Sequence, residues 1–317
     1  MTTKARDHGG GLDAACARYG GARIGWIDLS TGINPSAYPI PPLSQDAWTA
    51  LPDQFAMDRL ISAARRFWHI PDTVGIMAAP GASVLIAQLP GLRAAGRVVI
   101  PAPTYNEHAA AFQNHGWQVA SDGPAQAQVV VHPNNPDGHI WTRNTLPVEA
   151  ADLTIIDESF CDVSPHVSMI GKATEPGTII LKSFGKFWGL AGLRLGFAIG
   201  DPTIISALKN NIGPWSVAGP ALCIGARALE DTAWASQTRL RLKAGSDRLD
   251  QLMIAKGAKL QGGTSLFRLY DVDDAAQWQD RLARHRIWTR IFPYNARWLR
   301  LGIPAAVHWP RVRAALT

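Results

Sequence analysis

The chain has 317 residues, of which 47% are hydrophobic and 18% charged, and its formal net charge is +6. This balance is typical of a folded globular protein and excludes a disordered chain, and no run approaches the roughly 20 apolar residues that a membrane span requires. The basic residues are scattered and form no nucleic-acid-binding motif, so we expect neither a membrane partner nor a nucleic-acid partner.

The predicted elements begin after a segment rich in glycine and proline. Residues 1–40 lack sustained periodicity and are predicted to form an ordered arm or loop. Apolar residues at helical spacing predict one helix over 60–68 and another over 83–95. Short apolar strands and a helix then follow in turn. We expect strands at 97–100, 128–131, 153–157, 178–181 and 195–199, and a helix at 107–115.

From about residue 217 the pattern changes. Long helices are predicted at 220–229 and 232–256, followed by strands at 266–270 and 298–301 and a helix at 275–284. This order predicts a smaller α+β domain. We therefore divide the chain into an N-terminal arm on the substrate side (1–40), a large domain that binds the cofactor (41–216) and a small C-terminal domain (217–317).

The strands of the large domain predict an α/β fold. Continuously apolar strands separated by helices are typical of a mostly parallel sheet covered by helices on both faces. In such sheets, ligands bind beyond the carboxyl ends of the strands. Asn135, Asp157, Ser183 and Lys186 each lie just past the end of a predicted strand. We therefore expect these four residues to share one site.

The glycine-rich sequence SFGKFWGLAGLR contains the residue types of a covalent cofactor site. Ser183 lies three residues before Lys186, and Arg194 lies eight residues after it. Nearby positive charge favours the neutral amine of a lysine, the form that attacks an aldehyde, and an arginine binds phosphate through several donors. Most lysines are simply exposed, but the flanking glycines and aromatic residues favour the covalent role here. This pattern points to pyridoxal 5′-phosphate (PLP).

Four further positions each have a structural and a functional interpretation. Ser83, with Gly81 and Ala82, either binds a phosphate or caps a helix. Tyr105 either stacks on a flat ring or is a partly buried residue at a helix start. Asn135 lies in a run of turn-forming residues, where its amide could contact a ring oxygen. Asp157 ends an apolar strand and requires a partner, either a salt bridge or a protonated pyridine nitrogen.

The termini supply the remaining candidates. Arg300 lies in an apolar strand, where it acts either as a carboxylate clamp or as a charge on an edge strand. His8 and Asn34 lie in the glycine-rich arm.

The cysteines Cys16, Cys161 and Cys223 form no CxxC pair and no zinc spacing, which predicts reduced thiols and no metal site. The first residues do not form an apolar signal segment, so we expect a cytoplasmic protein.

Taken in order, these motifs resemble the fold-type I PLP enzymes of the class I/II aminotransferase family, from about Leu29 to Gly302. Within that family, the opening His8-Gly9-Gly10 and the segment Leu29–Pro35 are most similar to the threonine-phosphate decarboxylases of cobalamin biosynthesis. Histidinol-phosphate aminotransferases are the other close group. The resemblance implies a seven-stranded sheet, a small C-terminal domain, PLP as cofactor, a small phosphorylated amino acid as substrate, and a homodimer.

The resemblance also implies roles for individual residues. Lys186 would bind the cofactor covalently, and Asp157 would contact its pyridine nitrogen; both are the predicted catalytic residues. The other predicted cofactor-binding residues are Gly81, Ala82, Ser83, Tyr105, Asn135, Ser183 and Arg194. The predicted substrate-binding residues are His8, Gly9, Gly32, Asn34, Asn135, Arg290 and Arg300.

The chain departs from the family pattern at two positions. Leu51 stands where relatives often have a tyrosine that reaches the cofactor phosphate of the partner subunit. Phe160 stands where relatives commonly have a tyrosine three residues after the aspartate, so Asn135 would contact the ring oxygen with one donor fewer beside it. Neither change removes an essential catalytic group.

The implied reaction is decarboxylation of L-threonine O-3-phosphate to 1-amino-2-propanol O-2-phosphate. The alternative is an aminotransferase that acts on a phosphorylated substrate such as histidinol phosphate. The outcome depends on which bond the substrate anchors hold perpendicular to the cofactor ring, an angle that the sequence does not give. A PLP-binding protein without turnover would be expected to lack Lys186, Asp157 or Arg300, and all three are present.

Overall fold

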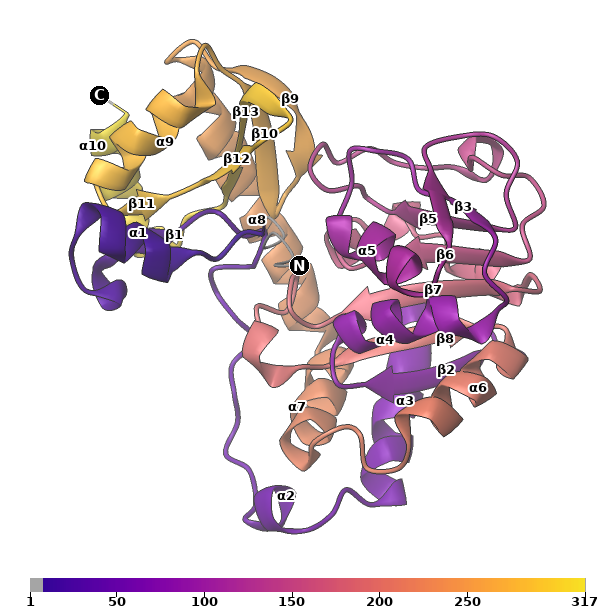
Figure 1. The fold of residues 1–317 in the computed structure, drawn as a ribbon. Coiled ribbons are helices and arrows are strands. Elements are labelled where there is room, and N and C mark those ends of the chain that lie inside the picture. The colour runs from indigo at the N-terminus through magenta and orange to yellow at the C-terminus, as the bar shows by residue number, and fades with distance from the viewer. Residues whose placement is uncertain (1–7, 317) are drawn as a thin grey trace. The chain divides into compact units, whose positions relative to one another are not determined.

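The computed structural model describes residues 8–316. Its contacts divide the chain into two compact units (Figure 1). The large unit comprises Ala37–Asn135 and His139–Gln237, and the small unit comprises the chain up to Ser36, the three residues Pro136–Gly138, and the chain from Thr238 onward. The boundaries at 40 and 216 that the sequence suggests stay a prediction.

A seven-stranded sheet forms the centre of the large unit. Its strands lie in the order β2-β8-β7-β6-β5-β3-β4. All neighbouring strands are parallel except at β8, which is antiparallel to both β2 and β7. The predicted α/β fold with a mostly parallel sheet is therefore confirmed. The bounds are β2 Gly75–Ala79, β3 Arg97–Val99, β4 Gln118–Ala120, β5 Ala127–Val131, β6 Leu153–Asp157, β7 Thr178–Ser183 and β8 Gly196–Gly200.

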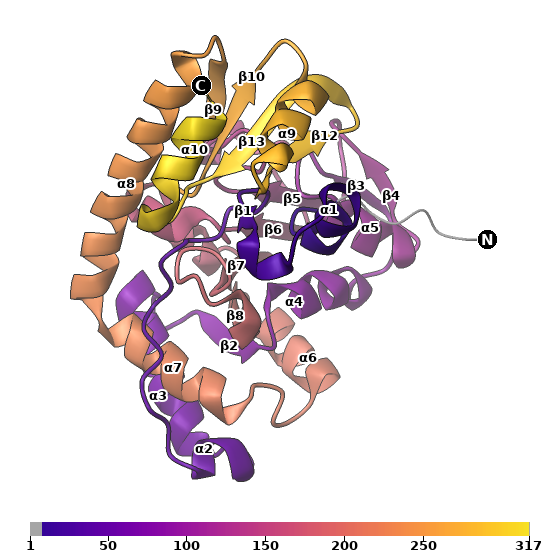
Figure 2. The same ribbon diagram turned by 90° about the vertical axis from the view of Figure 1, so that its left-hand side faces the viewer.

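Helices cover both faces of this sheet. Alternate residues of a strand point to opposite faces, so the apolar side chains on each face pack against helices. Met77, Val129, Ile155 and Leu181 pack in one buried cluster with residues of α4, α5 and α6. On the other face, Phe197 packs against α3 through Trp68, and α7 packs on α3 (Figure 2). The bounds are α2 Asp46–Thr49, α3 Gln54–Trp68, α4 Ala82–Gln88, α5 Asn106–Asn114, α6 Pro202–Ile212 and α7 Gly219–Glu230.

The small unit contains an antiparallel sheet in the order β12-β13-β10-β9 and a short parallel pair, β1 with β11. Leu249, Tyr270, Leu299 and Leu301 are buried in its core. The bounds are α1 Leu12–Tyr19, β1 Ile27–Asp28, α8 Thr232–Ile254, β9 Lys259–Thr264, β10 Phe267–Asp271, α9 Ala275–Arg284, β11 Ile287–Trp288, β12 Arg290–Phe292, β13 Asn295–Gly302 and α10 Trp309–Ala315. The first residues of α8 belong to the large unit.

The structure corrects the interpretation of residues 1–40 as arm or loop, since this segment contains α1 and β1. The helix gives a weak sequence signal because its N-cap, Gly11, has no capping side chain and only Leu12 and Ala15 are buried. Within residues 8–316, no helix combines the length and the apolar character needed to cross a membrane.

Residues 136–138 belong to the small unit because their backbone lies directly against β9. The N–H of Gly263 donates to the carbonyl of Asp137 over 2.7 Å. A Cβ at Gly262 would lie 2.0 Å from the Asp137 oxygen, and a Cβ at Gly138 would lie 2.2 Å from the Gly263 oxygen. Glycine is therefore required on both sides of this contact.

Candidate active site

The sheet brings the predicted residues of the large unit to one edge. β2, β3, β5, β6 and β7 run in the same direction, so their carboxyl ends lie at the same edge. Gly196, the first residue of β8, pairs with the last residues of both β2 and β7. Asp157 and Ser183 are the last residues of β6 and β7. The residues that lie just after a strand end are Gly81, Tyr105, Asn135 and Lys186.

Gly81 lies directly against the guanidinium of Arg194. Its φ of 88° favours glycine, and a Cβ there would lie 2.5 Å from Nη2 of Arg194. The Arg194 guanidinium therefore occupies the space that only glycine leaves open, and its Nη1 donates to the carbonyl of Ala191 over 3.1 Å. The hydroxyl of Ser183 accepts from the N–H of Gly185 over 3.2 Å. The guanidinium of Arg194 and the hydroxyl of Ser183 form a donor set that suits a phosphate.

Ser83 is not the cap of α4. The N-cap of this helix is Gly81, without a side-chain cap bond, and Ser83 is its second residue. The Ser83 side chain is exposed. The structural alternative for Ser83 is therefore wrong, while its role in phosphate binding stays a prediction.

Asp157 is buried, with 2% of its surface exposed, and both of its oxygens have partners. His108 Nε2 lies 2.9 Å from Oδ2, and Ser159 donates to Oδ1 from its N–H and its hydroxyl. Burial by itself raises the pKa of the Asp157 carboxyl, but the contacts with His108 and Ser159 outweigh this and hold the pKa below its usual range. Asp157 is therefore an ionised carboxylate at the end of β6.

Two residues of this site, His108 and Asn134, were not predicted from the sequence. His108 lies in the first turn of α5, three residues after Tyr105, and the two rings meet edge to face with centroids 6.1 Å apart. Asn134, which is buried, donates to the carbonyl of Pro103 over 3.0 Å and accepts from the Thr104 hydroxyl over 2.6 Å. Asn134 thus ties the loop before Asn135 to the loop before Tyr105.

The loop that carries Lys186 is anchored by tryptophans. Lys186 is half-buried, and its Nζ lies 5.3 Å from the centroid of the Phe160 ring. Two residues further on, the indole N–H of Trp188 donates to Asp162 Oδ2 over 3.1 Å. The indole N–H of Trp68 donates to the other oxygen of Asp162 over 2.9 Å. Asp162 therefore fixes this loop against α3.

A second lysine lies nearby, but it is locked in an ionic network. Lys182 Nζ lies 2.6 Å from Glu158 Oε2 and 3.6 Å from Asp162 Oδ1. Burial alone lowers the pKa of Lys182, yet the two carboxylates outweigh it and raise the pKa above its usual value. A lysine held as ammonium does not attack an aldehyde. Lys186 is therefore the candidate for covalent attachment.

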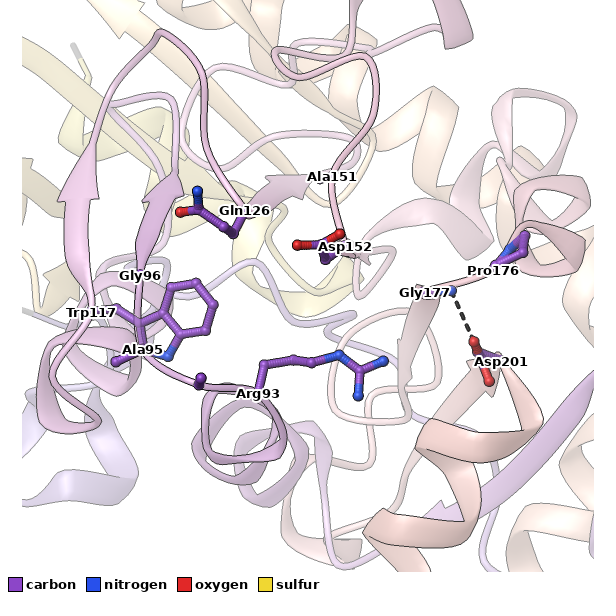
Figure 3. Close-up of a pocket in the computed structure, with 11 residues that line it drawn as sticks. Arg93, Ala95, Gly96, Trp117, Gln126, Ala151, Asp152, Pro176, Gly177 and Asp201 are labelled. Carbon is purple, nitrogen blue, oxygen red and sulfur yellow. Dashed lines mark hydrogen bonds between the residues drawn. The ribbon is translucent and has the colours of Figure 1, made fainter.

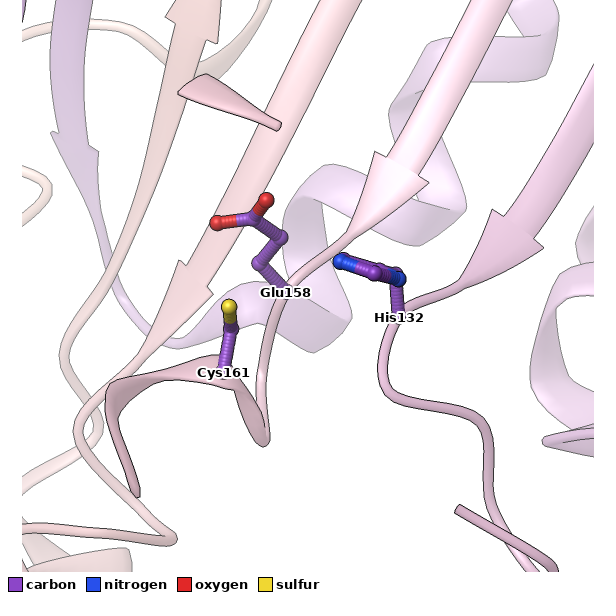
Figure 4. Close-up of side chains that lie close together, drawn as sticks. All are labelled: His132, Glu158 and Cys161. Carbon is purple, nitrogen blue, oxygen red and sulfur yellow. The ribbon is translucent and has the colours of Figure 1, made fainter. Parts of the chain in front are cut away.

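His132, Glu158 and Cys161 point toward one another and offer ligand atoms within 4.8 Å (Figure 4). The ligand atoms of His132 and Glu158 already form hydrogen bonds within the protein. The Nδ1 of His132 accepts from the N–H of Trp141, so Nε2 donates to the carbonyl of Val167. Glu158 accepts bonds on both oxygens, one of them from the Lys182 ammonium. We interpret this cluster as a structural network and not as a metal centre.

A hollow of about 860 Å³ lies at the opposite edge of the sheet (Figure 3). It is lined by residues that precede the parallel strands, among them Gly96, Gln126, Asp152 and Gly177. Ligands of such sheets bind at the carboxyl ends, and none of the predicted site residues lines this hollow. It is therefore not the candidate site.

In the small unit, Arg290 and Arg300 are cross-strand partners on β12 and β13. Arg300 is 5% exposed, and its Nη2 donates to the carbonyl of Ser30 over 2.6 Å. Burial, and then the like charge of Arg290, lower the pKa of Arg300 to about 10. Two neighbouring guanidinium groups, of which Arg300 is buried, are suited to an anionic ligand. The alternative that Arg300 is a surface charge on an edge strand is wrong.

The other predicted substrate residues of the small unit gather on the segment after β1. The N–H of Gly10 donates to the Ser30 hydroxyl over 2.7 Å, which places the His8-Gly9-Gly10 segment beside it. Gly32 and Asn34 are buried, and Asn34 Oδ1 accepts from the N–H of Ser36 over 3.0 Å. His8 is exposed. The contacts of His8, Gly9, Gly32 and Asn34 with a substrate stay predictions.

Comparison with known proteins gives consistent results. The family model for class I and II aminotransferases matches residues 41–317. The chain is 39% identical to the threonine-phosphate decarboxylase of Pseudomonas aeruginosa, over 98% of this chain and 97% of that protein. It is also 39% identical to the threonine-phosphate decarboxylase of Sinorhizobium sp., over 93% of this chain and 92% of that protein.

One solved structure illustrates the similarity of fold. The histidinol-phosphate aminotransferase from Sinorhizobium meliloti, in complex with pyridoxal-5′-phosphate, matches with a TM-score of 0.80 over 96% of this chain and 93% of that chain. The sequence identity is 20%. At this identity the match supports the fold and not the substrate.

Proposed function

Because the chain belongs to the class I and II aminotransferase family, we propose that it is a PLP-dependent decarboxylase of L-threonine O-3-phosphate. The product is 1-amino-2-propanol O-2-phosphate, for cobalamin biosynthesis. The observation that carries this proposal is the 39% identity to two threonine-phosphate decarboxylases over nearly the whole chain. The geometry of both units supports it.

The edge of the large sheet fits PLP. Gly81 leaves room for the Arg194 guanidinium, so that Arg194 and Ser183 can bind the cofactor phosphate. Asp157, which is ionised by its contacts with His108 and Ser159, can hold the proton of a pyridine nitrogen. Lys186 supplies the amine for covalent attachment. When bound, PLP supplies an electron sink for the bond that is cleaved.

The residues of the chain then divide the remaining tasks. His108 and Ser159 orient the Asp157 carboxylate and keep it charged. Asn135 and Tyr105 lie on loops that Asn134 ties together, where they can orient the cofactor ring. Arg290 and Arg300 bind the phosphate and the carboxylate of the substrate as charge-assisted partners. The anchors thereby select the bond that is broken.

The oligomeric state and the compartment are part of the same proposal. Large apolar side chains are exposed along one stretch of the large unit, namely Trp48, Leu51 and Phe55, at 66% or more. Exposed apolar groups of this size favour association, and we assign this surface to the homodimer contact. The three cysteines are free thiols, which suits the reducing cytoplasm.

The test compares three substrates with purified protein loaded with PLP. Threonine phosphate, threonine and histidinol phosphate are incubated in parallel, with and without 2-oxoglutarate, and both CO2 release and amino transfer are measured. We expect CO2 release with threonine phosphate and no requirement for 2-oxoglutarate. Amino transfer from histidinol phosphate without CO2 release would establish the aminotransferase alternative instead.

The same preparation tests the lysine. Reduction with borohydride and peptide mapping should find the cofactor attached at Lys186 and not at Lys182. Lys186→Ala should abolish the attachment and lower decarboxylation by at least about 100-fold, the lower end of what a positioned proton-transfer group contributes. Lys209→Ala, at an exposed position of α6, serves as the matched control and should retain both.

A further inference from the structure

Ser30 is buried, with 1% of its surface exposed, and its polar atoms contact three separate segments. Its N–H and its hydroxyl both donate to Asp28 Oδ1, over 2.8 and 2.6 Å. Since a serine hydroxyl has one hydrogen, the contact with Asp28 fixes its direction and leaves its lone pairs to accept from Gly10. The carbonyl of Ser30 accepts from Arg300.

The opening segment approaches Ser30 more closely than a side chain would permit. A Cβ at Gly9 would lie 2.5 Å from the Ser30 carbonyl oxygen and 3.1 Å from its carbonyl carbon. Gly9 therefore has to be glycine for the segment to lie here. The same carbonyl oxygen is the acceptor of the Arg300 guanidinium at 2.6 Å, so the segment and the buried arginine meet at one atom.

The Arg300 contact is strong because its donor is charged. Asp28 lies close enough to raise the pKa of Arg300, against the larger lowering by burial and by Arg290. Ser30 is thus held by Asp28 on one side and by Arg300 on the other. A group fixed from both sides transmits the position of one neighbour to the other.

We propose that Ser30 is a positioning residue that holds the His8-Gly9-Gly10 segment in place relative to Arg300, and that it thereby sets the affinity for the phosphate group of the substrate. This inference rests on the proposed function for the identity of the substrate. The contacts that carry it are independent of that function. The hydroxyl controls the opening segment, and the carbonyl controls the arginine.

Ser30→Ala distinguishes the role of the Ser30 hydroxyl from that of its carbonyl. The substitution removes the acceptor of the Gly10 N–H but leaves the carbonyl that Arg300 contacts. Ser30→Thr retains a hydroxyl and is the rescue variant. Ser246→Ala is the matched control, because Ser246 is also a buried serine of the small unit and its hydroxyl donates one bond, to the carbonyl of Lys243.

Two measurements on the cofactor-loaded protein test the proposal without relying on turnover. Hydrogen exchange reports the protection of the amides of residues 9–11, and titration calorimetry reports the Kd of inorganic phosphate. We expect Ser30→Ala to accelerate exchange in this segment and to weaken phosphate binding about tenfold, which corresponds to about 1.4 kcal/mol. Ser30→Thr and Ser246→Ala should behave as the wild type in both.

Kinetics then give a third measurement. With threonine phosphate, Ser30→Ala should raise KM more than it lowers kcat, while binding of unphosphorylated threonine is unchanged. Unchanged exchange in Ser30→Ala would overturn the proposal, and so would faster exchange with an unchanged Kd for phosphate. A wild-type protein that binds phosphate in this way but does not decarboxylate threonine phosphate would refute the proposed function and leave the role of Ser30 intact.

Discussion

In the large unit, Lys182 is enclosed by the carboxylates of Glu158 and Asp162, whereas in the small unit Arg300 lies opposite a second cation, Arg290. The surroundings act on the two charges in opposite directions. The carboxylates raise the pKa of Lys182 in spite of burial, while burial and Arg290 lower the pKa of Arg300 to about 10. Both side chains are almost fully buried.

This difference distinguishes a buried charge that stabilises the fold from a buried charge that binds a ligand. A buried cation whose carboxylates come from its own unit needs no ligand, and its removal damages the fold. A buried cation whose surroundings disfavour its charge is stabilised most when an anionic ligand binds beside it. Four predictions follow from this contrast, in order of decreasing effect.

The largest effect is expected from Lys182→Met. This change leaves the buried carboxylates of Glu158 and Asp162 without their cation, which should lower the free energy of unfolding by about 3–5 kcal/mol. Lys243→Met is the control, since the exposed pair of Lys243 with Asp247 should contribute less than about 0.5 kcal/mol. Urea unfolding measures both. Equal stability of the two variants would remove the contrast between the units.

Inorganic phosphate should stabilise the cofactor-loaded protein through the small unit. At 100 times its Kd, a ligand that binds only the folded state raises the free energy of unfolding by about 2.7 kcal/mol. Arg300→Gln should lose at least half of this gain. Arg297→Gln should keep it, because Arg297 lies on the same strand but is exposed and bonded to Asp271. A gain that survives in Arg300→Gln would show that phosphate binds elsewhere.

A smaller effect is expected from Trp188→Phe. The phenyl ring can retain packing against Phe184, but Asp162 Oδ2 loses its indole donor, at a cost of about 1–3 kcal/mol. Trp215→Phe, at a side chain that is 60% exposed, should change stability by no more than about 0.5 kcal/mol. We also expect weaker retention of the cofactor in Trp188→Phe alone, measured as the rate of its release on dialysis. Equal retention in both variants would argue against the anchoring of the Lys186 loop by Asp162.

The smallest effect concerns pH. The folded-state pKa of Asp157 is lowered, so its contribution to stability is present above the unfolded value of about 3.9 and is lost as the pH falls through the folded value. We expect the free energy of unfolding to decrease below about pH 4. Asp157→Asn should make this decrease shallower, while the exposed Asp247→Asn should not. Urea unfolding between pH 6 and pH 3 compares the slopes, and identical slopes would contradict the ionised state of Asp157.

The sequence predicts those parts of the fold that depend on local patterns. β5, β6 and β7 are short apolar runs rich in valine or isoleucine, and the polar residues after them mark the edge of the sheet. β2 and β4 lack such a run, because β2 is made of Gly, Ala, Met and a single Ile, and β4 has only one β-branched residue, Val119. The helix α1 is missed for a different reason, since its N-cap has no capping side chain and only two of its residues are buried.

Contacts between distant residues cannot be predicted in this way. His108 reaches Asp157 across 49 positions, and Arg300 reaches Ser30 across 270. No local pattern marks such a pair, because the contact arises only when two elements pack. Lys182 and Lys186 lie four positions apart; the glycines around Lys186 mark it in the sequence, but the ionic partners of Lys182, Glu158 and Asp162, are seen only in the structure.

The short segment Pro136–Gly138, which lies against β9, has a consequence for how the protein can be divided. The smaller unit is built from three separate segments of the chain, which end at Ser36, span Pro136–Gly138 and begin again at Thr238. Neither unit is therefore a contiguous stretch that can be deleted, exchanged or expressed as one piece. In a fragment that starts at residue 238, Gly262 and Gly263 of β9 would lack the backbone of Asp137 and Gly138, against which they pack.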